Sequence, residues 1–503
     1  MSLERIIGIE TEYGILAPNA KANPMQLSSL VVGAYRDSGV PWAAWDYSAE
    51  DPLCDARGFH LERAAAHPSQ LTHVPRPAMR VRGEPTAIVL PNGARFYVDH
   101  AHPEYSAPET STARQAALWD KAGEAICLAA IQHLPTIDIG IYKNNTDGKG
   151  ASYGMHENYL VDRLVPFDDL VAFMVPFLVT RQIYAGSGRV GLGQHSQDPG
   201  FQLSQRADFI EAIVGLETTM RRPIINTRDE PHADPTLWRR LHVIVGDATM
   251  LEVATYLRVG TTALALTCLE ACFGAPDAGE AGRGAAGPGA PSRIPDGFLD
   301  AVRLADPVAA FRQVSRDTTI SEPLALAAGG HATAIEIQRR YLALAKQITQ
   351  HPADGEVGDL LGRWESVLDR LGSDPLTCAG DVEWVAKYRL LSALAAREPA
   401  GWAAPKVAAA DLQWTDIRPD RSLAARLMAA GAVETLFTPE EVAAAVATPP
   451  PSTRAHLRGR AVATPPGALA ANWDSVTLHP PADAEPPIRL EFPDPWVALL
   501  QDG

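Results

Sequence analysis

The sequence has few cysteines and no long apolar run. Five cysteines stand among 503 residues, and none forms a Cys-x-x-Cys pair. An odd number of thiols at irregular spacing is typical of reduced cysteines, so we expect a cytoplasmic protein. No run reaches the ~18 apolar residues of a membrane-spanning helix, and the first residues lack the pattern of a signal peptide. We therefore expect no membrane partner.

Positive charge is in deficit. Lysine and arginine number 44 against 60 aspartates and glutamates, which gives a net charge of −16 at pH 7. This balance argues against a general nucleic-acid partner and against a membrane surface. The glycine-rich stretch 186–193 lacks the Gly-Lys-Ser/Thr ending of a phosphate-binding loop, so we interpret it as a turn.

The stretch Asn92–Glu109, NGARFYVDHAHPEYSAPE, carries the densest group of chemically active side chains. Asn92-Gly93 predicts a tight turn between two antiparallel strands. Because side chains alternate along a strand, three polar groups of the second strand share one face: Arg95, Tyr97 and Asp99. Glu104 follows just past the end of this predicted strand. Taken alone, the hairpin is equally well interpreted as a charged surface strand.

A second predicted strand has the same design. Within Arg5–Leu16, RIIGIETEYGIL, Glu10 and Glu12 lie on one face, with carboxylates roughly 7 Å apart. If both strands share a sheet, these carboxylates converge with Asp99 and Glu104. Crowded carboxylates repel one another unless cations lie between them. Oxygen ligands of this kind suit Mg²⁺ bound together with substrate phosphates.

Two further segments carry polar groups. HENYLVDRL places His156 and Asn158 on one face of a predicted strand. The stretch 201–240 is the basic part of an acidic chain, with two histidines, His232 and His242, in or just after it, and six arginines: Arg206, Arg221, Arg222, Arg228, Arg239 and Arg240. Arginine binds phosphate and carboxylate in a bidentate manner, although any single one of these is also interpretable as a solvated surface residue.

Four blocks of sequence resemble the family of enzymes that attach or remove the prokaryotic ubiquitin-like protein Pup. They are IGIETEYG, NGARFYVDHAHPEYSAPE, YKNNTDGKGASYGMHENYL and RPIINTRDEPHAD. The family is part of the carboxylate-amine ligase superfamily, which includes glutamine synthetase, and the resemblance covers essentially the whole chain. It implies an α+β fold in which a curved, mainly antiparallel sheet forms a cradle and helices pack on its outer face. Periodicity alone supports only a mixture of helices and strands.

We expect a large catalytic domain at residues 1–434 and a small C-terminal domain at 435–503. Residues 36–80 form a long stretch without clear periodicity, which we interpret as an inserted mobile loop. This insertion resembles the depupylase branch of the family, and the ligase branch lacks it. Residues 274–295 are dominated by glycine, alanine and proline, and we interpret them as a disordered insertion.

The resemblance to the depupylase branch implies a hydrolase. Its target is the C-terminal glutamine amide of Pup or the isopeptide bond between Pup and a substrate lysine. The implied cofactors are Mg²⁺ and ATP, or ADP plus phosphate. The implied metal ligands are Glu10, Tyr97 and Glu104. The implied cofactor-binding residues are Arg95, Arg206, Arg228, His156 and Trp473, the last of which is equally interpretable as a core tryptophan. Asp99 is the implied catalytic group, either attacking the carbonyl or activating water or phosphate.

Two alternatives stay open. The first is a Pup–protein ligase, which the insertion at 36–80 disfavours. The second is a non-enzymatic, nucleotide-dependent adaptor that links Pup-tagged proteins to a proteasomal ATPase, and the full set of carboxylates disfavours it. The expected partners are Pup and pupylated proteins, with the proteasomal ATPase as a further candidate, and no nucleic acid.

Overall fold

The computed structural model describes residues 4–19, 21–66, 86–274, 294–349, 355–480 and 486–496. Within these residues, one twelve-stranded sheet runs through the molecule. In spatial order its strands are β13 (Ile210–Gly215), β14 (Arg222–Asn226), β15 (Trp238–Val243), β10 (Met155–Asp162), β1 (Ile7–Glu12), β8 (His102–Ser106), β7 (Arg95–Asp99), β6 (Ala87–Val89), β3 (Ala43–Trp45), β18 (Ala468–Ala471), β19 (Ser475–Leu478) and β20 (Ile488–Glu491). Neighbours are antiparallel except β13–β14 and β3–β18, which are parallel.

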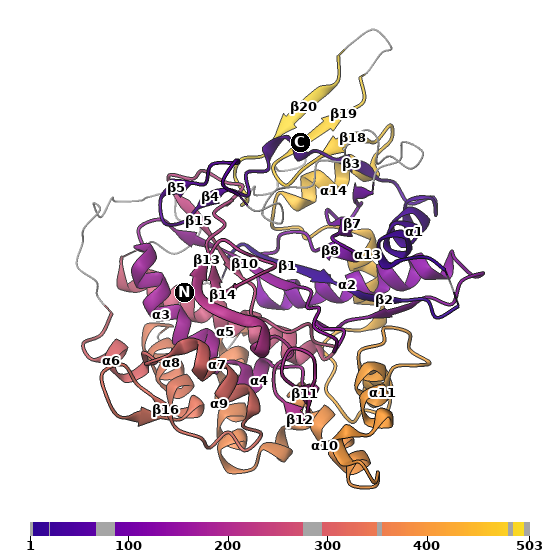
Figure 1. Cartoon of the computed structure of the whole chain (residues 1–503). Helices are drawn as coiled ribbons and strands as arrows, with labels where there is room; N and C mark the ends of the chain where they lie inside the picture. Colours follow the sequence, from indigo (N-terminus) through magenta and orange to yellow (C-terminus); the bar gives the residue numbers. More distant parts are fainter. Residues whose placement is uncertain are drawn as a thin grey trace.

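Helices surround the sheet (Figure 1). They are α1 (Pro24–Arg36), α2 (Ala113–Gln132), α3 (Phe167–Thr180), α4 (Gln182–Ala185), α5 (Glu252–Cys272), α6 (Phe298–Val302), α7 (Pro307–Arg316), α8 (Ala334–Thr349), α9 (Gly355–Ser373), α10 (Glu383–Ala395), α11 (Pro405–Trp414), α12 (Leu423–Ala429), α13 (Pro439–Ala447) and α14 (Ala455–Ala463). In the view of Figure 1, α3 and α6–α9 gather at the lower end and β18–β20 form the upper end. None of the helices in the described ranges is long and apolar enough to cross a membrane.

Short two-stranded sheets complete the fold of the described residues. They are β2 (Gly14–Leu16) with β9 (Gly140–Tyr142), β4 (Cys54–Asp55) with β5 (Phe59–His60), β11 (Arg189–Leu192) with β12 (Asp198–Gln202), and β16 (Leu324–Ala325) with β17 (His331–Ala332). The glycine-rich stretch 186–193 therefore leads into the β11–β12 hairpin rather than wrapping a phosphate. All five cysteines are free.

The two faces of β1 have opposite character. Ile7 and Ile9 are 1% exposed and belong to the main apolar core. On the same face, the Thr11 hydroxyl donates to Asp120 of α2 at 2.9 Å. Glu10 and Glu12 consequently point to the opposite face, as the alternation of the sequence predicts.

The predicted hairpin is present. The turn at Asn92-Gly93 joins β6 to β7, and Gly93 has a φ of +80°. A side chain at Gly93 would also lie only 2.9 Å from the carbonyl oxygen of Ala455 in α14. Glycine is therefore required twice over at this position, by backbone conformation and by close packing.

Glu104 lies inside a third strand rather than past the end of one. β8 pairs with β7 on one side and with β1 on the other. Proline and glutamate are poor strand formers, so Pro103 and Glu104 give little local signal. Tertiary pairing on both sides fixes this strand, and a tight reversal at His100, whose φ is +50°, makes it possible.

The first part of the predicted loop at 36–80 is ordered. Ala43–Trp45 forms β3, an internal strand between β6 and β18, and a 3₁₀ turn, Tyr47–Ala49, follows it. Three residues are too few to show strand periodicity, which is why the sequence reads as a loop. Residues 67–80 lie outside the described residues, as do 275–293 of the predicted low-complexity insertion.

The sheet runs through the predicted domain boundary near residue 435. Strand β18 pairs with β3, so that Ala470 lies opposite Ala44. Helix α13 packs against α2, and the Asn92 amide donates to the Ala445 carbonyl at 3.0 Å. The C-terminal residues are therefore joined to the N-terminal sheet, and an independent domain at 435–503 stays a prediction.

Candidate active site

The polar face of the central strands carries the candidate site. In the sheet register, Glu10 lies opposite His156, and Glu12 lies opposite Glu104. Glu104 in turn lies opposite Tyr97 on the next strand. Directly paired residues point to the same side of a sheet. Strands β10, β1, β8 and β7 therefore display two adjacent rows of polar groups.

The first cluster is a group of three carboxylates, and each offers an oxygen within 4.8 Å of the others: Glu12, Asp99 and Glu104. The Tyr97 hydroxyl donates to Glu104 at 2.5 Å. Burial, and then the charges of the neighbouring carboxylates, raises the pKa of Glu104 well above its ordinary value. For Glu12, burial acts in the same direction, but the hydrogen bond and charge of His102 outweigh it and lower the pKa to about 2. The crowding of the carboxylates therefore disfavours ionisation of Glu104, and a divalent cation bound between them would remove this penalty.

Asp99 is the most open member of this cluster. Its side chain is 35% exposed, whereas Glu104 is 2% exposed. The imidazole Nδ1 of His100 lies 2.8 Å from an Asp99 carboxylate oxygen. The hydrogen bond and charge of Asp99 raise the pKa of His100 to about 9, so His100 is a cation at neutral pH. Asp99 is thus a carboxylate at the open edge of the cluster, within reach of a substrate.

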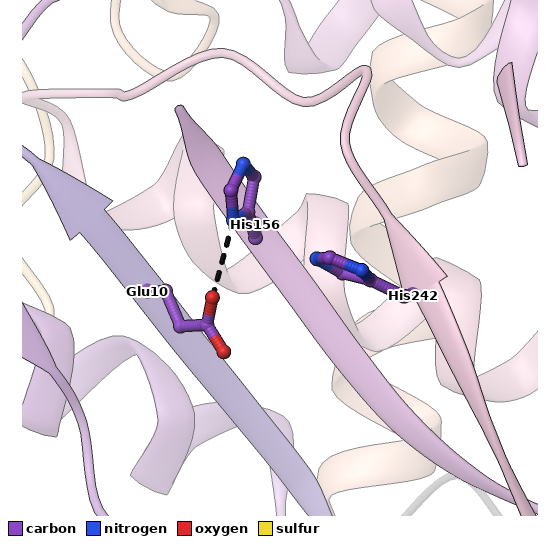
Figure 2. A group of neighbouring side chains, drawn as sticks. All are labelled: Glu10, His156 and His242. Atoms are coloured by element: carbon purple, nitrogen blue, oxygen red, sulfur yellow. Dashed lines mark hydrogen bonds and ion pairs between the residues drawn. The ribbon is translucent and has the colours of Figure 1, made fainter. Parts of the chain in front are cut away.

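The second cluster combines one carboxylate with two imidazoles (Figure 2): Glu10, His156 and His242. Figure 2 shows these side chains on three neighbouring strands, with an ion pair of 3.1 Å between Glu10 and His156. Burial opposes ionisation of Glu10, but His156, Arg240 and Asn158 outweigh it and lower its pKa to about 2.

His242 is neutral and has one free ring nitrogen. Burial, and then the nearby positive charges of Arg240 and His156, lower its pKa well below the ordinary value. Its Nδ1 lies 3.2 Å from the amide oxygen of Asn226, while its buried Nε2 has no hydrogen-bond partner among the described residues. A neutral imidazole held in this way is a typical metal ligand.

The residues that the resemblance implies as metal ligands are distributed over two adjacent clusters on the polar face. Tyr97 and Glu104 belong to the first cluster, whereas Glu10 belongs to the second. The sequence analysis noted His242 beside the basic stretch but did not place it in the site. The strand register shows why His242 belongs to the site, because Asn158 lies directly opposite it.

Arg95 is enclosed by aromatic rings. Its guanidinium carbon lies 4.2 Å from the ring centre of Trp45 and 3.8 Å from that of Tyr97. Its Nη1 lies 3.3 Å from a carboxylate oxygen of Glu50, which also accepts a hydrogen bond from Trp45 Nε1 at 2.7 Å. The ordered part of the predicted loop therefore forms one wall of the site.

Trp473 lines a cleft beside the second cluster. Other lining residues include Glu10, Asn158, His232, Arg240 and Arg454. The ring of Trp473 packs edge-on against Trp45, with centroids 5.1 Å apart. Trp473 therefore both packs against Trp45 and lines the cleft.

The predicted arginines lie around these clusters. Arg228 is half-buried, with Nε 3.9 Å from a carboxylate oxygen of Glu230. Arg206 is 1% exposed and donates to Ser152 Oγ and to two backbone carbonyls. Two candidate cation sites and several guanidinium groups thus lie on one face of the sheet. This arrangement suits a polyanion that binds together with divalent cations.

The chain is similar to known proteins over most of its length. Residues 5–477 match the family described as Pup-ligase protein. The chain is 47% identical over 493 residues to a depupylase of Acidothermus cellulolyticus. The alignment covers 95% of this chain and 92% of that protein. It is 45% identical over 485 residues to a Pup deamidase/depupylase of Mycobacterium tuberculosis, with 94% and 91% covered. A Pup–protein ligase of Micrococcus luteus is 35% identical over 477 residues, with 91% and 88% covered.

Two solved structures are also similar. The crystal structure of the complex between Pup and its ligase PafA matches with a TM-score of 0.76 and 32% identity, covering 99% of this chain and 90% of that one. The structure of PafA in complex with ADP matches with a TM-score of 0.70 and 35% identity, covering 86% and 93%. These likenesses confirm the predicted α+β fold.

Proposed function

The chain belongs to the Pup-ligase protein family, and on this basis we propose that it is a Pup deamidase and depupylase. It hydrolyses the side-chain amide of a C-terminal glutamine of Pup, and the isopeptide bond between Pup and a substrate lysine. The observation that carries the proposal is similarity across the whole chain. Relatives named depupylase or Pup deamidase/depupylase are 47% and 45% identical, whereas the Micrococcus luteus ligase is 35% identical.

The residues fit two divalent cations and a nucleotide. The first cluster offers carboxylate oxygens and the Tyr97 hydroxyl, a donor set that suits Mg²⁺. The second cluster offers Glu10, His156 and the free Nε2 of His242. The cleft beside Trp473 has the aromatic wall that a nucleobase requires, and Arg95, Arg206 and Arg228 are the cationic candidates for phosphate groups. The similarity to PafA in its complex with ADP supports the binding of a nucleotide.

The residues of the chain have separate roles in the proposed reaction. Asp99, at the open edge of the first cluster, either attacks the amide carbonyl or takes the proton of the attacking water or phosphate. His100, held as a cation by Asp99, orients that side chain through the contact at 2.8 Å. Divalent cations held by the two clusters would polarise the carbonyl as Lewis acids and neutralise developing charge.

Pup and pupylated proteins are the proposed partners, and the similarity to PafA in its complex with Pup supports Pup. A proteasomal ATPase remains a candidate partner. The free thiols support a cytoplasmic location.

Intact-mass measurement tests the proposal. The protein is incubated with Pup ending in glutamine, with and without ATP and Mg²⁺, and separately with a Pup–lysine conjugate. A gain of one mass unit, as NH₂ is replaced by OH, reports deamidation, and release of the lysine-bearing partner reports depupylation. Formation of a conjugate from Pup ending in glutamate, with ATP consumed, would identify a ligase instead. No change under any condition would favour the adaptor.

A further inference from the structure

Two arginines converge beside the first cluster. Arg206 donates from Nη1 to the Ser152 hydroxyl at 2.8 Å. Arg222, the first residue of β14, donates from Nη2 to the Ser152 carbonyl, also at 2.8 Å. Both guanidinium groups are therefore held against one residue, although Arg206 and Arg222 come from different elements.

Neither cation has an ion-pair partner among the described residues. In the part of the chain that the structure describes, no carboxylate oxygen lies within 4.0 Å of either guanidinium. Their other hydrogen bonds go to the backbone carbonyls of Tyr153, Ile244 and Thr218. The buried Nε of Arg206 has no acceptor among the described residues.

Holding two like charges together in this way is costly. Burial, and then the charge of Arg222, lower the pKa of Arg206 to about 9. Several other buried arginines of the described residues are ion-paired, as Arg181 is with Glu157 at 2.6 Å and Arg454 with Glu109 at 2.8 Å, whereas the buried Arg239 donates to the Val165 carbonyl. In a chain of net charge −16, two adjacent arginines without a carboxylate point to a ligand that brings the negative charge.

The pair lies close to the proposed reaction centre. Arg206 donates to the carbonyl of Tyr153, and the backbone amide of the next residue, Gly154, donates to a carboxylate oxygen of Glu12 in the first cluster at 2.8 Å. The charge of Arg222 acts in turn on His100, the direct partner of Asp99. An anion held by the two arginines would therefore sit beside the cluster at which the scissile carbonyl is bound.

A C-terminal glutamine carries such an anion. Its α-carboxylate is separated from the side-chain amide by a few carbon atoms, so one residue presents both groups. We propose that Arg206 and Arg222 bind the α-carboxylate of the substrate's C-terminal residue and thereby restrict the reaction to that residue. This inference rests on the proposed function and names the recognition element of its substrate. Phosphate has the same charge chemistry, and the resemblance assigns Arg206 to phosphates, so the test separates the two anions.

The test uses Pup ending in glutamine with either a free α-carboxylate or an α-carboxamide. For the wild-type protein, kcat/KM should fall about 10- to 100-fold with the carboxamide, the range expected for loss of charge-assisted hydrogen bonds. In Arg222→Gln the free-carboxylate substrate should become as poor as the carboxamide, so that the ratio between them approaches one. Arg222→Lys keeps the charge but loses the fork, and should give an intermediate ratio.

Arg221→Gln is the matched control. Arg221 is the neighbouring residue and is exposed, so its variant should keep the full wild-type ratio. The affinity for ATP with Mg²⁺, measured by calorimetry, should be unchanged in Arg222→Gln.

The outcomes are distinct. If the wild-type protein hydrolyses both substrates equally well, the carboxylate site is refuted while the proposed function stands. If it hydrolyses neither, the proposed function itself is refuted. If Arg222→Gln keeps the carboxylate preference but binds ATP or inorganic phosphate more weakly, the anion is phosphate and the inference is overturned. The wild-type comparison remains decisive even where Arg222→Gln fails to fold.

Discussion

Replacing Glu109 with glutamine should destabilise the protein in a pH-dependent way. Glu109 follows β8 and is 7% exposed. Its carboxylate accepts hydrogen bonds from Arg454 and from Arg458. Arg458 also donates to the carbonyls of Gly93 and Trp473. One buried anion therefore ties helix α14 to the hairpin turn and to the tryptophan of the cleft.

The magnitude follows from the pKa of Glu109. Burial opposes its ionisation, but the two arginines outweigh burial and lower the pKa from 4.5 to about 2. At 1.36 kcal/mol per pKa unit, this corresponds to about 3 kcal/mol of folding free energy. Removing one partner of a buried ion pair costs a similar amount, about 3–5 kcal/mol, because the remaining charges stay buried. For a chain of 503 residues that melts cooperatively, this lowers Tm by about 3–5 °C.

The sign of the pH dependence is fixed. A carboxylate whose pKa is depressed on folding contributes its full stability above the unfolded-state pKa and loses it as the pH falls toward the folded-state value. The Tm difference between wild type and Glu109→Gln should therefore be constant from about pH 5 to pH 8 and should shrink at lower pH.

Differential scanning calorimetry across this pH range measures the effect. Glu441→Gln is the control, because Glu441 pairs with Arg114 at an exposed position and should contribute less than about 1 kcal/mol. A Tm difference for Glu109→Gln below that of the control would refute the reasoning, as would a difference that disappears between about pH 6 and pH 8.

Four further predictions follow from the site and the fold. Asp99→Asn should bind nucleotide but lose both deamidation and isopeptide cleavage, and wild-type turnover in the mass assay would contradict its catalytic assignment. Glu10→Ala should weaken Mg²⁺-dependent ATP binding in calorimetry, because an anionic oxygen ligand is lost; unchanged affinity and activity would mean that Glu10 binds no metal. Trp473→Ala should weaken ATP binding about 2- to 10-fold, whereas the exposed Trp42→Ala should not, and equal affinities would identify Trp473 as a packing residue only. Deleting residues 40–69 should prevent cooperative melting, because it removes β3 from the interior of the sheet, and a deletion variant that melts like wild type would contradict that placement.

Local patterns predicted the faces of the central strands correctly. Glu10 and Glu12 share one face of β1, and Arg95, Tyr97 and Asp99 alternate along β7, because side-chain alternation is a property of the single strand. The turn at Asn92-Gly93 was equally predictable, since it depends on the conformational freedom of two adjacent residues.

Elements that depend on distant partners were missed. Strand β8 contains Pro103 and Glu104, which have little tendency to form a strand alone, and its two neighbours stabilise it. Strand β3 is three residues long, and its partner β18 lies more than four hundred positions away.

The sequence by itself determined which chemical groups this protein holds and which of them share a strand face. Its four family-like blocks also pointed to the family before any fold was seen. The tertiary structure decided which of those groups meet. In the fold, Tyr97 and Glu104 lie with Glu12 and Asp99. Glu10 lies with His156 and His242, and Arg222 lies beside Arg206. Strand order and register are set by pairing between segments far apart in the chain, and that pairing has no signature in the local periodicity of either partner.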